Sequence, residues 1–282
     1  MKLCRYGKPG YEKPGVIDSE GKLRDLSKIV DNLGPNEISP RGLKMLTRQK
    51  VDSLPLVNGA QRFGVPYVGI GKFVAIGLNY SDHAKEGGQP IPAEPIVFMK
   101  ATTCISGPSD DIVQPRNSTK LDWEIELGVV IGTQAKYVGE AEALSHVAGY
   151  CIVNDVSERA FQMATSQWDK GKGFDTAGPI GPWLVTTDEI RDPQVLDMSL
   201  DLNGRRMQSG NTRTMIFSVA KIIAHVSQYM TLLPGDILCT GTPPGVGLGI
   251  KPEPVFLKPG DVMTLNIQGL GEQKQKVVAY SA

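Results

Sequence analysis

The chain has 282 residues, and its 30 basic and 30 acidic side chains give a formal net charge of zero. Such a balance argues against broad electrostatic binding to nucleic acid or to an anionic membrane surface. The sequence has no apolar run long enough to cross a bilayer, and its first residues lack the apolar core of a signal peptide. The four cysteines are widely separated and form no Cys-x-x-Cys pair, so we expect reduced thiols in a cytoplasmic protein.

The first part of the chain predicts a small mixed domain. Residues 1–16 have the pattern of a strand, a Gly/Pro turn and a second strand. Residues 23–46 carry helical periodicity, which prolines interrupt at Pro35 and Pro40. From about residue 54 the chain becomes loop-like. We therefore place a domain boundary near residue 70, with a small N-terminal α+β domain at 1–70 and a second domain at 71–282.

The second part predicts a mixed α/β fold dominated by strands. The Asn-Gly pair inside residues 200–207 indicates a hairpin, and residues 215–230 place their apolar side chains on one helical face. Residues 81–95 are polar and rich in glycine and proline, which is typical of a mobile loop. The predicted strands cover residues 72–78, 96–100, 122–131, 148–156, 182–186, 237–240 and 262–267.

Two glutamates in one predicted strand are the most informative feature. Glu124 and Glu126 alternate with apolar residues, so their carboxylates point to the same side of the strand. Two such carboxylates repel one another unless a cation lies between them; a solvated strand face is the alternative. Asp155 adds a third carboxylate within an apolar β-branched run, where Asp is disfavoured. Together the three form a candidate hard-oxygen site for Mg²⁺, Mn²⁺ or Ca²⁺.

A histidine and a glutamate follow the strand predicted at 72–78. His83 and Glu86 are three residues apart, so they share a face if the segment forms a helical turn. A carboxylate beside a histidine raises its basicity and fixes its tautomer, which suits a general base. A polar surface turn is the alternative. The other histidines, His146 and His225, are expected near a helix end and on a helix flank, where structural roles are more common.

Two further segments contain groups that can bind anions. Residues 240–247 form a glycine-rich turn after a strand, which can aim backbone N–H groups at an anion or serve as an ordinary tight turn. The segment lacks the Gly-Lys-Ser/Thr of a Walker loop. Lys170 and Lys172 lie among glycines, a setting that is typical of an accessible surface loop.

Taken in order, these segments resemble the fumarylacetoacetate hydrolase superfamily over about residues 70–280. The resemblance rests on five motifs: Gly-Leu-Asn-Tyr-Ser-Asp-His-Ala at 77–84, Asp-Trp-Glu-Ile-Glu-Leu-Gly-Val-Val-Ile-Gly at 122–132, Gly-Tyr-Cys-Ile-Val-Asn-Asp-Val-Ser at 149–157, Lys-Gly-Phe-Asp-Thr at 172–176 and Thr-Gly-Thr-Pro-Pro-Gly-Val-Gly at 240–247. It implies a mixed β-sandwich roll, a divalent metal ion, for which Mg²⁺ is expected and Mn²⁺ or Ca²⁺ are alternatives, and a homodimer. The segment 81–95 matches a lid that becomes ordered over the ligand.

The resemblance also implies roles for individual residues. The catalytic residues are expected to be His83, Glu86 and Lys172, in which the His–Glu dyad activates water. The metal ligands are expected to be Glu124, Glu126 and Asp155. Thr242 matches the position that holds the substrate carboxylate, and the predicted substrate-binding residues are Asn79, Tyr80, Gly241 and Thr242.

The function that the resemblance implies is hydrolysis of a C–C bond in a 2,4-dioxo acid to pyruvate and a carboxylic acid. The small N-terminal part is similar to a bacterial branch that includes 2,4-diketo-3-deoxy-sugar-acid hydrolases acting in L-rhamnose and L-fucose breakdown. Proteins of that branch are also labelled ureidoglycolate lyase or 2-hydroxyhepta-2,4-diene-1,7-dioate isomerase, so both activities remain alternatives, as does oxaloacetate decarboxylation. A small-acid-binding protein without catalysis is the alternative outside enzymes. The expected partner is a small 2-oxo acid, with neither nucleic acid nor membrane.

Overall fold

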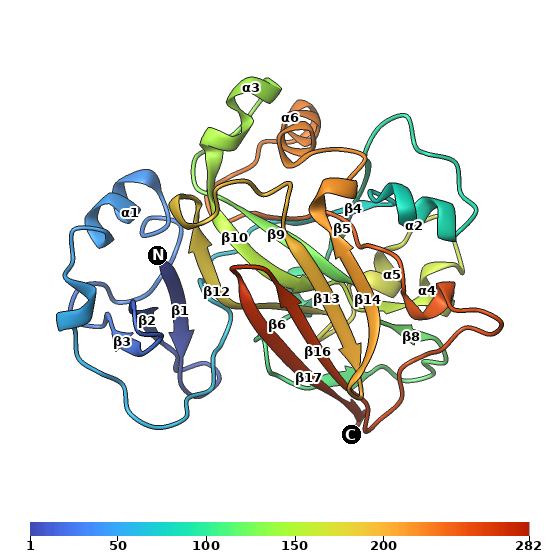
Figure 1. Cartoon of the computed structure of the whole chain (residues 1–282), viewed down its shortest axis with the longest axis horizontal. Coiled ribbons are helices and arrows are strands. Elements are labelled where there is room, and N and C mark those ends of the chain that lie inside the picture. Colours follow the sequence, from blue (N-terminus) through green and yellow to red (C-terminus); the bar gives the residue numbers. More distant parts are fainter. Residues whose placement is uncertain (282) are drawn as a thin grey trace.

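The two long strands β9 (Ile125–Ile131) and β10 (Val147–Asn154) are buried along their whole length. Their runs of Val, Ile and Leu are typical of strands that are covered on both faces. They pair antiparallel near the middle of a ten-stranded sheet in the computed structural model, which describes residues 1–281. The sheet order is β3-β2-β1-β12-β10-β9-β15-β4-β5, and β6 pairs with β12 (Figure 1).

The other strands of this sheet are β1 (Lys2–Tyr6), β2 (Lys13–Ile17), β3 (Leu23–Asp25), β4 (Phe73–Gly77), β5 (Ile96–Lys100), β6 (Ile105–Ser106), β12 (Gly178–Thr186) and β15 (Ile237–Cys239). A two-stranded sheet pairs β8 (Leu121–Asp122) with β11 (Ser157–Glu158).

A second sheet, ordered β14-β13-β16-β17-β7, covers the face of β9, β10 and β12, as the red and orange strands in Figure 1 show. Buried and exposed residues alternate along β13 and β17, because one face packs on the core and the other meets solvent. The two layers enclose the main hydrophobic core. The strands of this second sheet are β7 (Ile112–Gln114), β13 (Asp197–Leu202), β14 (Arg205–Asn211), β16 (Val262–Ile267) and β17 (Gly271–Ala279).

The helices lie around the sheets. The longest, α6 (Val219–Tyr229), begins after Ser218, whose side chain caps the Lys221 amide. The predicted start at residue 215 was therefore four residues too early. The remaining α-helices are α1 (Pro40–Leu46), α2 (Ser81–Glu86), α3 (Glu140–Ala143), α4 (Arg159–Gln162) and α5 (Asp169–Lys172). Short 3₁₀ helices occur at Val51–Ser53, Thr102–Cys104, Leu144–His146, Thr187–Glu189, Thr212–Thr214 and Gly247–Gly249.

The helix suggested by periodicity at residues 23–46 is wrong. This segment contains β3, a run of turns and only then α1, which begins where Ser39 caps it and Pro40 occupies its first turn. Its buried residues Leu26, Leu33 and Ile38 join the main hydrophobic core from turns and not from one helical face, so their helical spacing is incidental.

The N-terminal strands continue the main sheet, because β1 pairs antiparallel with β12. The Asn203–Gly204 hairpin forms as predicted, with both residues at positive φ. All four cysteines are free and buried. Among residues 1–281 there is no helix with the length and apolar character needed to span a membrane.

Candidate active site

Three predicted carboxylates meet in one cavity. The strand expected at 122–131 is interrupted, because β8 ends at Asp122 and β9 begins at Ile125, so that Glu124 lies in the break. The amide of Asp155 donates to the carbonyl oxygen of Glu124 (2.9 Å), since β9 and β10 pair antiparallel. Glu124, Glu126 and Asp155 all line a cavity of about 380 Å³. Because their side chains are buried, the alternative of a solvated strand face is excluded.

Buried cations surround these carboxylates. Lys172 bridges two of them, with Nζ 2.7 Å from Glu124 Oε2 and 2.6 Å from Asp155 Oδ2. Lys100, at the end of β5, donates to Asp155 Oδ1 (2.5 Å) and to the Lys172 carbonyl oxygen. Lys172 is only 2% exposed, so the interpretation of this residue as a surface lysine is wrong. We call the whole group the charged cluster; it comprises Asp122, Glu124, Glu126, Asp155, Lys100, Arg159 and Lys172.

Sequence reasoning missed Lys100, Arg159 and Asp122. Arg159 contacts Asp122 Oδ2 and Glu124 Oε1, at 2.8 and 2.7 Å, and it lines the cavity. A weak signal was available for Lys100, which follows the apolar run 96–99, and for Asp122, which lies between Leu121 and Trp123. Nothing in the spacing indicated that they would meet.

The surroundings of Glu124 and Glu126 shift the pKa values of the two carboxyls in opposite directions. Burial raises the pKa of both carboxyls. For Glu124 the charges of Lys172 and Arg159 outweigh burial and lower its pKa. For Glu126 the negative charges of Asp155 and Glu124 act with burial, so its pKa lies well above its usual range. The positive charges near Glu126 are thus too few to offset its burial and the two neighbouring carboxylates.

The charge count supports a divalent cation. The charged cluster has four carboxylates and three cations, which leaves one net negative charge when all are ionised. Buried charge is costly unless it is balanced. A divalent ion near Glu126 would bring the cluster to a net charge of plus one, and one substrate carboxylate would neutralise it. The residues present therefore fit a hard cation such as Mg²⁺, with Glu124, Glu126 and Asp155 as the predicted ligands.

The raised pKa of Glu126 predicts how the metal-free protein responds to pH. Folded Glu126 keeps its proton to higher pH than in the unfolded chain, so stability should fall as pH rises above about 4.5. Urea unfolding of the metal-free protein and of Glu126→Gln between pH 5 and 8 measures this. The wild type should lose up to about 1.4 kcal/mol per pH unit relative to the variant. Parallel pH curves would show that Glu126 titrates normally.

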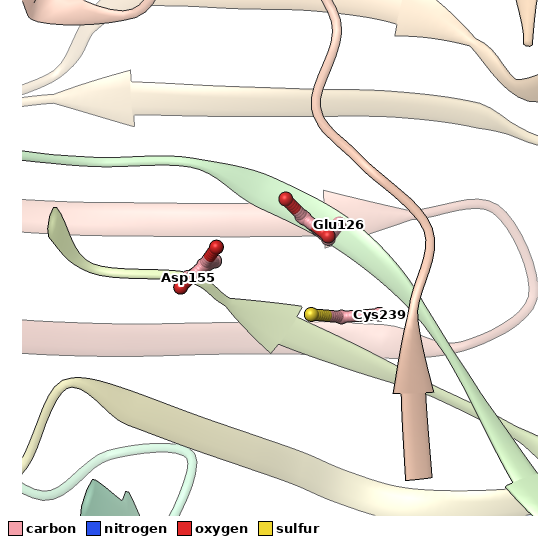
Figure 2. Close-up of side chains that lie close together, drawn as sticks. All are labelled: Glu126, Asp155 and Cys239. Atoms are coloured by element: carbon pink, nitrogen blue, oxygen red, sulfur yellow. The ribbon is translucent and has the colours of Figure 1, made fainter. Parts of the chain in front are cut away.

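Cys239, at the end of β15, also lies beside the metal-ligand candidates. Ligand atoms of Glu126, Asp155 and Cys239 all lie within 4.8 Å of one another, and Figure 2 shows the three side chains converging. Burial raises the pKa of the Cys239 thiol well above its usual range. A neutral thiol is a poor ligand for Mg²⁺, which prefers oxygen. We therefore interpret Cys239 as packing behind the carboxylates.

The predicted histidine–glutamate pair forms, and His83 of this pair lines the cavity. Residues 81–86 are the helix α2, and its single exposed turn brings His83 Nδ1 to 3.1 Å from Glu86 Oε2. Burial raises the pKa of Glu86, but the hydrogen bonds from His83 and from the Gly245 amide outweigh it and lower the pKa. An ionised Glu86 can accept a hydrogen bond from Nδ1–H of His83, which leaves Nε2 free as a base. His83 itself lines the cavity with the charged cluster.

Residues 81–95 retain the features of a lid, although the first six form α2. Most residues from 85 to 94 are exposed, so little burial opposes opening. Hydrogen exchange in this segment should slow when Mg²⁺ and oxalate are added together, because closure over the ligand would protect its amides. Residues 2–6 in β1, which pair with β2 and β12 and do not line the cavity, provide an internal reference. Equal exchange with and without ligand would contradict a lid.

The glycine-rich turn places two predicted substrate-binding residues on the cavity wall. Gly241 has φ +90°, and a side chain there would lie 2.8 Å from Asn79 Cβ, so glycine is required. Its amide donates to Glu126 Oε2 (2.7 Å). Thr242 donates to the Ile125 carbonyl oxygen (2.8 Å) and also lines the cavity.

Asn79 and Tyr80 lie outside this wall. The Asn79 side chain donates to the Phe217 and Thr240 carbonyl oxygens and accepts from the Phe217 amide, so both ends of its amide are occupied. Tyr80 is wholly buried, and its hydroxyl contacts Met198. Neither residue lines the cavity. These contacts hold the two side chains away from the cavity wall, and their role in binding substrate stays a prediction.

Part of the cavity wall is apolar and lies beside the charged cluster, since Lys172 Nζ is 5.3 Å from the centroid of the Phe98 ring. Phe98 and Trp168 form an edge-to-face pair with ring centroids 5.2 Å apart. Trp168 also packs on Gly77, where a Cβ atom would lie 2.6 Å from its ring. The cavity wall therefore combines charged and aromatic residues, a combination that suits a small acid with an acyl or alkyl portion. Its apolar lining includes Ile76, Leu78, Ile96, Phe98, Met163, Trp168 and Leu248.

Comparisons with known proteins agree with this architecture. The family model for the fumarylacetoacetate (FAA) hydrolase C-terminal region matches residues 72–278. A 2,4-didehydro-3-deoxy-L-rhamnonate hydrolase from Sphingomonas sp. (strain SKA58) is 59% identical over 98% of this chain and 96% of its own length. The fumarylacetoacetate hydrolase structure from Exiguobacterium antarcticum is 36% identical, with a TM-score of 0.90 over 99% of this chain and 100% of that one.

The maleylpyruvate hydrolase structure from Sphingobium sp. SYK-6 is also similar, with 28% identity and a TM-score of 0.82 over 99% of this chain and 100% of that one. The site and fold thus define an enzyme of the hydrolase class, built as a mixed, strand-rich β-sandwich. The chain belongs to the fumarylacetoacetate hydrolase family. The predicted family resemblance and fold class are therefore confirmed, whereas the division at residue 70 and the roles of individual site residues stay predictions.

Proposed function

We propose that the protein hydrolyses a C–C bond of an acylpyruvate, a 2,4-dioxo acid, to pyruvate and a carboxylic acid. The observation that carries this proposal is the position of His83, paired with Glu86, on the wall of the same cavity as a buried cluster with one uncompensated negative charge. The names of two relatives support it, since a 2,4-didehydro-3-deoxy-L-rhamnonate and maleylpyruvate are both acylpyruvates. The 59% identity favours a sugar-acid-derived substrate of the first kind.

Residues on the cavity wall have different roles in the proposed reaction. The imidazole of His83, oriented by Glu86, takes a proton from water, and the oxygen of that water attacks the 4-oxo carbon. The Lys172 ammonium stabilises the negative charge that develops on the former 4-oxo oxygen. The C3–C4 bond then breaks, the electron pair passes to the pyruvate portion, and C3 receives a proton. Glu124, Glu126 and Asp155 would hold a divalent cation, for which we favour Mg²⁺, and this cation would supply Lewis-acid withdrawal of electron density from the 2-oxo acid end of the substrate.

The cellular compartment and the oligomeric state are part of the same proposal. Four buried free cysteines are consistent with work in a reducing cytoplasm. We also infer a homodimer, by analogy with the family. Analytical ultracentrifugation tests this inference, and a monomer at micromolar concentration would contradict it.

A product assay over a panel of substrates tests the proposed activity. With Mg²⁺ present, an acylpyruvate should yield pyruvate together with the acid of its acyl group. Ureidoglycolate, oxaloacetate and 2-hydroxyhepta-2,4-diene-1,7-dioate are the matched comparisons for elimination, decarboxylation and isomerisation. Turnover of one of these three with inert acylpyruvates would replace hydrolysis with that reaction. Binding of 2-oxo acids without any turnover would support a non-catalytic protein.

A further inference from the structure

A short segment contacts both Glu86 of α2 and Asp122 of the charged cluster. We call residues 245–249 the glycine loop. On one side, the Gly245 amide donates to both oxygens of Glu86, at 3.1 and 3.3 Å. On the other side, the Gly247 amide donates to Asp122 Oδ1 (2.6 Å) and the Leu248 amide to Asp122 Oδ2 (3.1 Å). The glycine loop thus lies between the lid helix α2 and the charged cluster.

Asp122 is surrounded by donors from separate parts of the chain. Its carboxylate is wholly buried and also accepts from its neighbour's amide, Trp123 N (2.8 Å), and from Arg159 Nε (2.8 Å). Asp122 itself does not line the cavity, whereas Arg159 and Leu248 do. Its effect on the site therefore passes through these two residues.

The glycine loop has little freedom to compensate for a change at Asp122. A side chain at Gly247 would place its Cβ atom 2.0 Å from the Val255 carbonyl oxygen and 2.7 Å from Asp122 Oδ1. A Cβ atom at Gly249 would lie 3.0 Å from the Glu86 carboxylate, so the loop backbone lies directly against the lid residue. The loop is held by close backbone packing and by the carboxylate of Asp122.

We propose that Asp122 is a positioning residue that couples the lid to the charged cluster. By fixing the glycine loop, it holds the Gly245 amide where Glu86 meets it, and Glu86 in turn orients His83. By binding Arg159 with the same carboxylate, it sets the guanidinium that contacts Glu124. One buried carboxylate thereby fixes the position of the predicted base relative to the predicted metal ligands. This role goes beyond the proposed hydrolysis.

The variant Asp122→Asn tests this coupling. An amide keeps the size of the side chain but loses the charge, and its NH₂ group faces backbone donors. Hydrogen exchange of the metal-free protein should become faster in α2 and in the glycine loop by roughly tenfold or more, which is the effect of losing one charge-assisted hydrogen bond. The measurement needs no substrate, so its outcome is independent of whether the proposed hydrolysis is correct.

Asp236 provides a matched control. It is also a buried aspartate, and it accepts from the Lys72 and Leu233 amides and pairs with Lys72 Nζ, but it lies outside the cavity wall. Asp236→Asn should speed exchange near β4 and β15 and leave exchange in α2 unchanged. If both variants change exchange in α2 equally, Asp122 is only a structural residue and the proposal fails.

A double-variant cycle with Glu86 gives the sharper result. If the glycine loop carries the coupling, Glu86→Gln should speed exchange in α2, and adding Asp122→Asn to it should contribute little more. Independent, multiplicative effects of the two substitutions would overturn the proposal. Should Asp122→Asn not fold, Asp122→Glu retains the charge but displaces it by one methylene group, and the same pattern of exchange and non-additivity is expected.

Discussion

Removal of divalent cations is expected to lower turnover by about 10³-fold or more, because a bound cation contributes several kcal/mol of transition-state stabilisation. The reason lies in the charged cluster, where Glu126 is a buried carboxyl without sufficient positive charge. Chelation followed by re-addition of Mg²⁺ or Mn²⁺ measures the effect, with the product assay as readout. Activity should return with the metal.

Substitution of Glu126 provides the matching control for metal removal. Glu126→Ala should weaken Mg²⁺ binding in calorimetry and leave the far-ultraviolet circular dichroism largely intact, because one carboxyl is lost from a fold that many buried strand residues hold. Full turnover by a protein shown to be metal-free would contradict the proposed cation site.

Replacement of His83 by alanine should remove roughly 10²–10⁴-fold from C–C hydrolysis, the usual contribution of a general base. Any oxaloacetate decarboxylation should fall much less, since that reaction needs no activated water. His225→Ala is the matched control, because its half-buried ring packs on Tyr229 along α6, outside the cavity wall. Unchanged hydrolysis by His83→Ala would remove the dyad from the mechanism, even though the family assignment would stand.

The parts of the site that could be predicted are those in which local pattern and chemistry coincide. Glu124 and Glu126 stand out because charged residues alternate with apolar ones in a short segment, and Asp155 stands out because it sits in a β-branched run. The His83–Glu86 contact follows from helical spacing alone. These signals need no knowledge of which strands pair.

The parts that could not be predicted depend on pairing between distant segments. Lys100 reaches Asp155 only because β5 and β10 belong to one sheet, and Asp122 reaches the glycine loop across more than one hundred residues. The Lys172 setting among glycines resembles a surface loop, although tertiary contacts bury its ammonium group between two carboxylates. Burial of a charge is decided by its partners, which local sequence does not display.

The prediction of a helix at residues 23–46 failed for a related reason. Residues 23–46 have helical spacing, yet most of their buried apolar side chains enter the hydrophobic core from turns. The short helix α1 begins only at Pro40. The motif residues Asn79 and Tyr80 likewise contact distant segments of the chain. They lie directly before α2, but their polar atoms are used to hold the turn.

The incorporation of solvent oxygen tests the central claim most directly. The protein, loaded with Mg²⁺, is incubated with an acylpyruvate in oxygen-18-labelled water, and the carboxylic acid released from the acyl group is analysed by mass spectrometry. Water attack on the 4-oxo carbon predicts one labelled oxygen in that acid for each pyruvate formed. Pyruvate formation with an unlabelled second product, or no cleavage of any acylpyruvate alongside turnover of ureidoglycolate to glyoxylate and urea, would contradict hydrolysis.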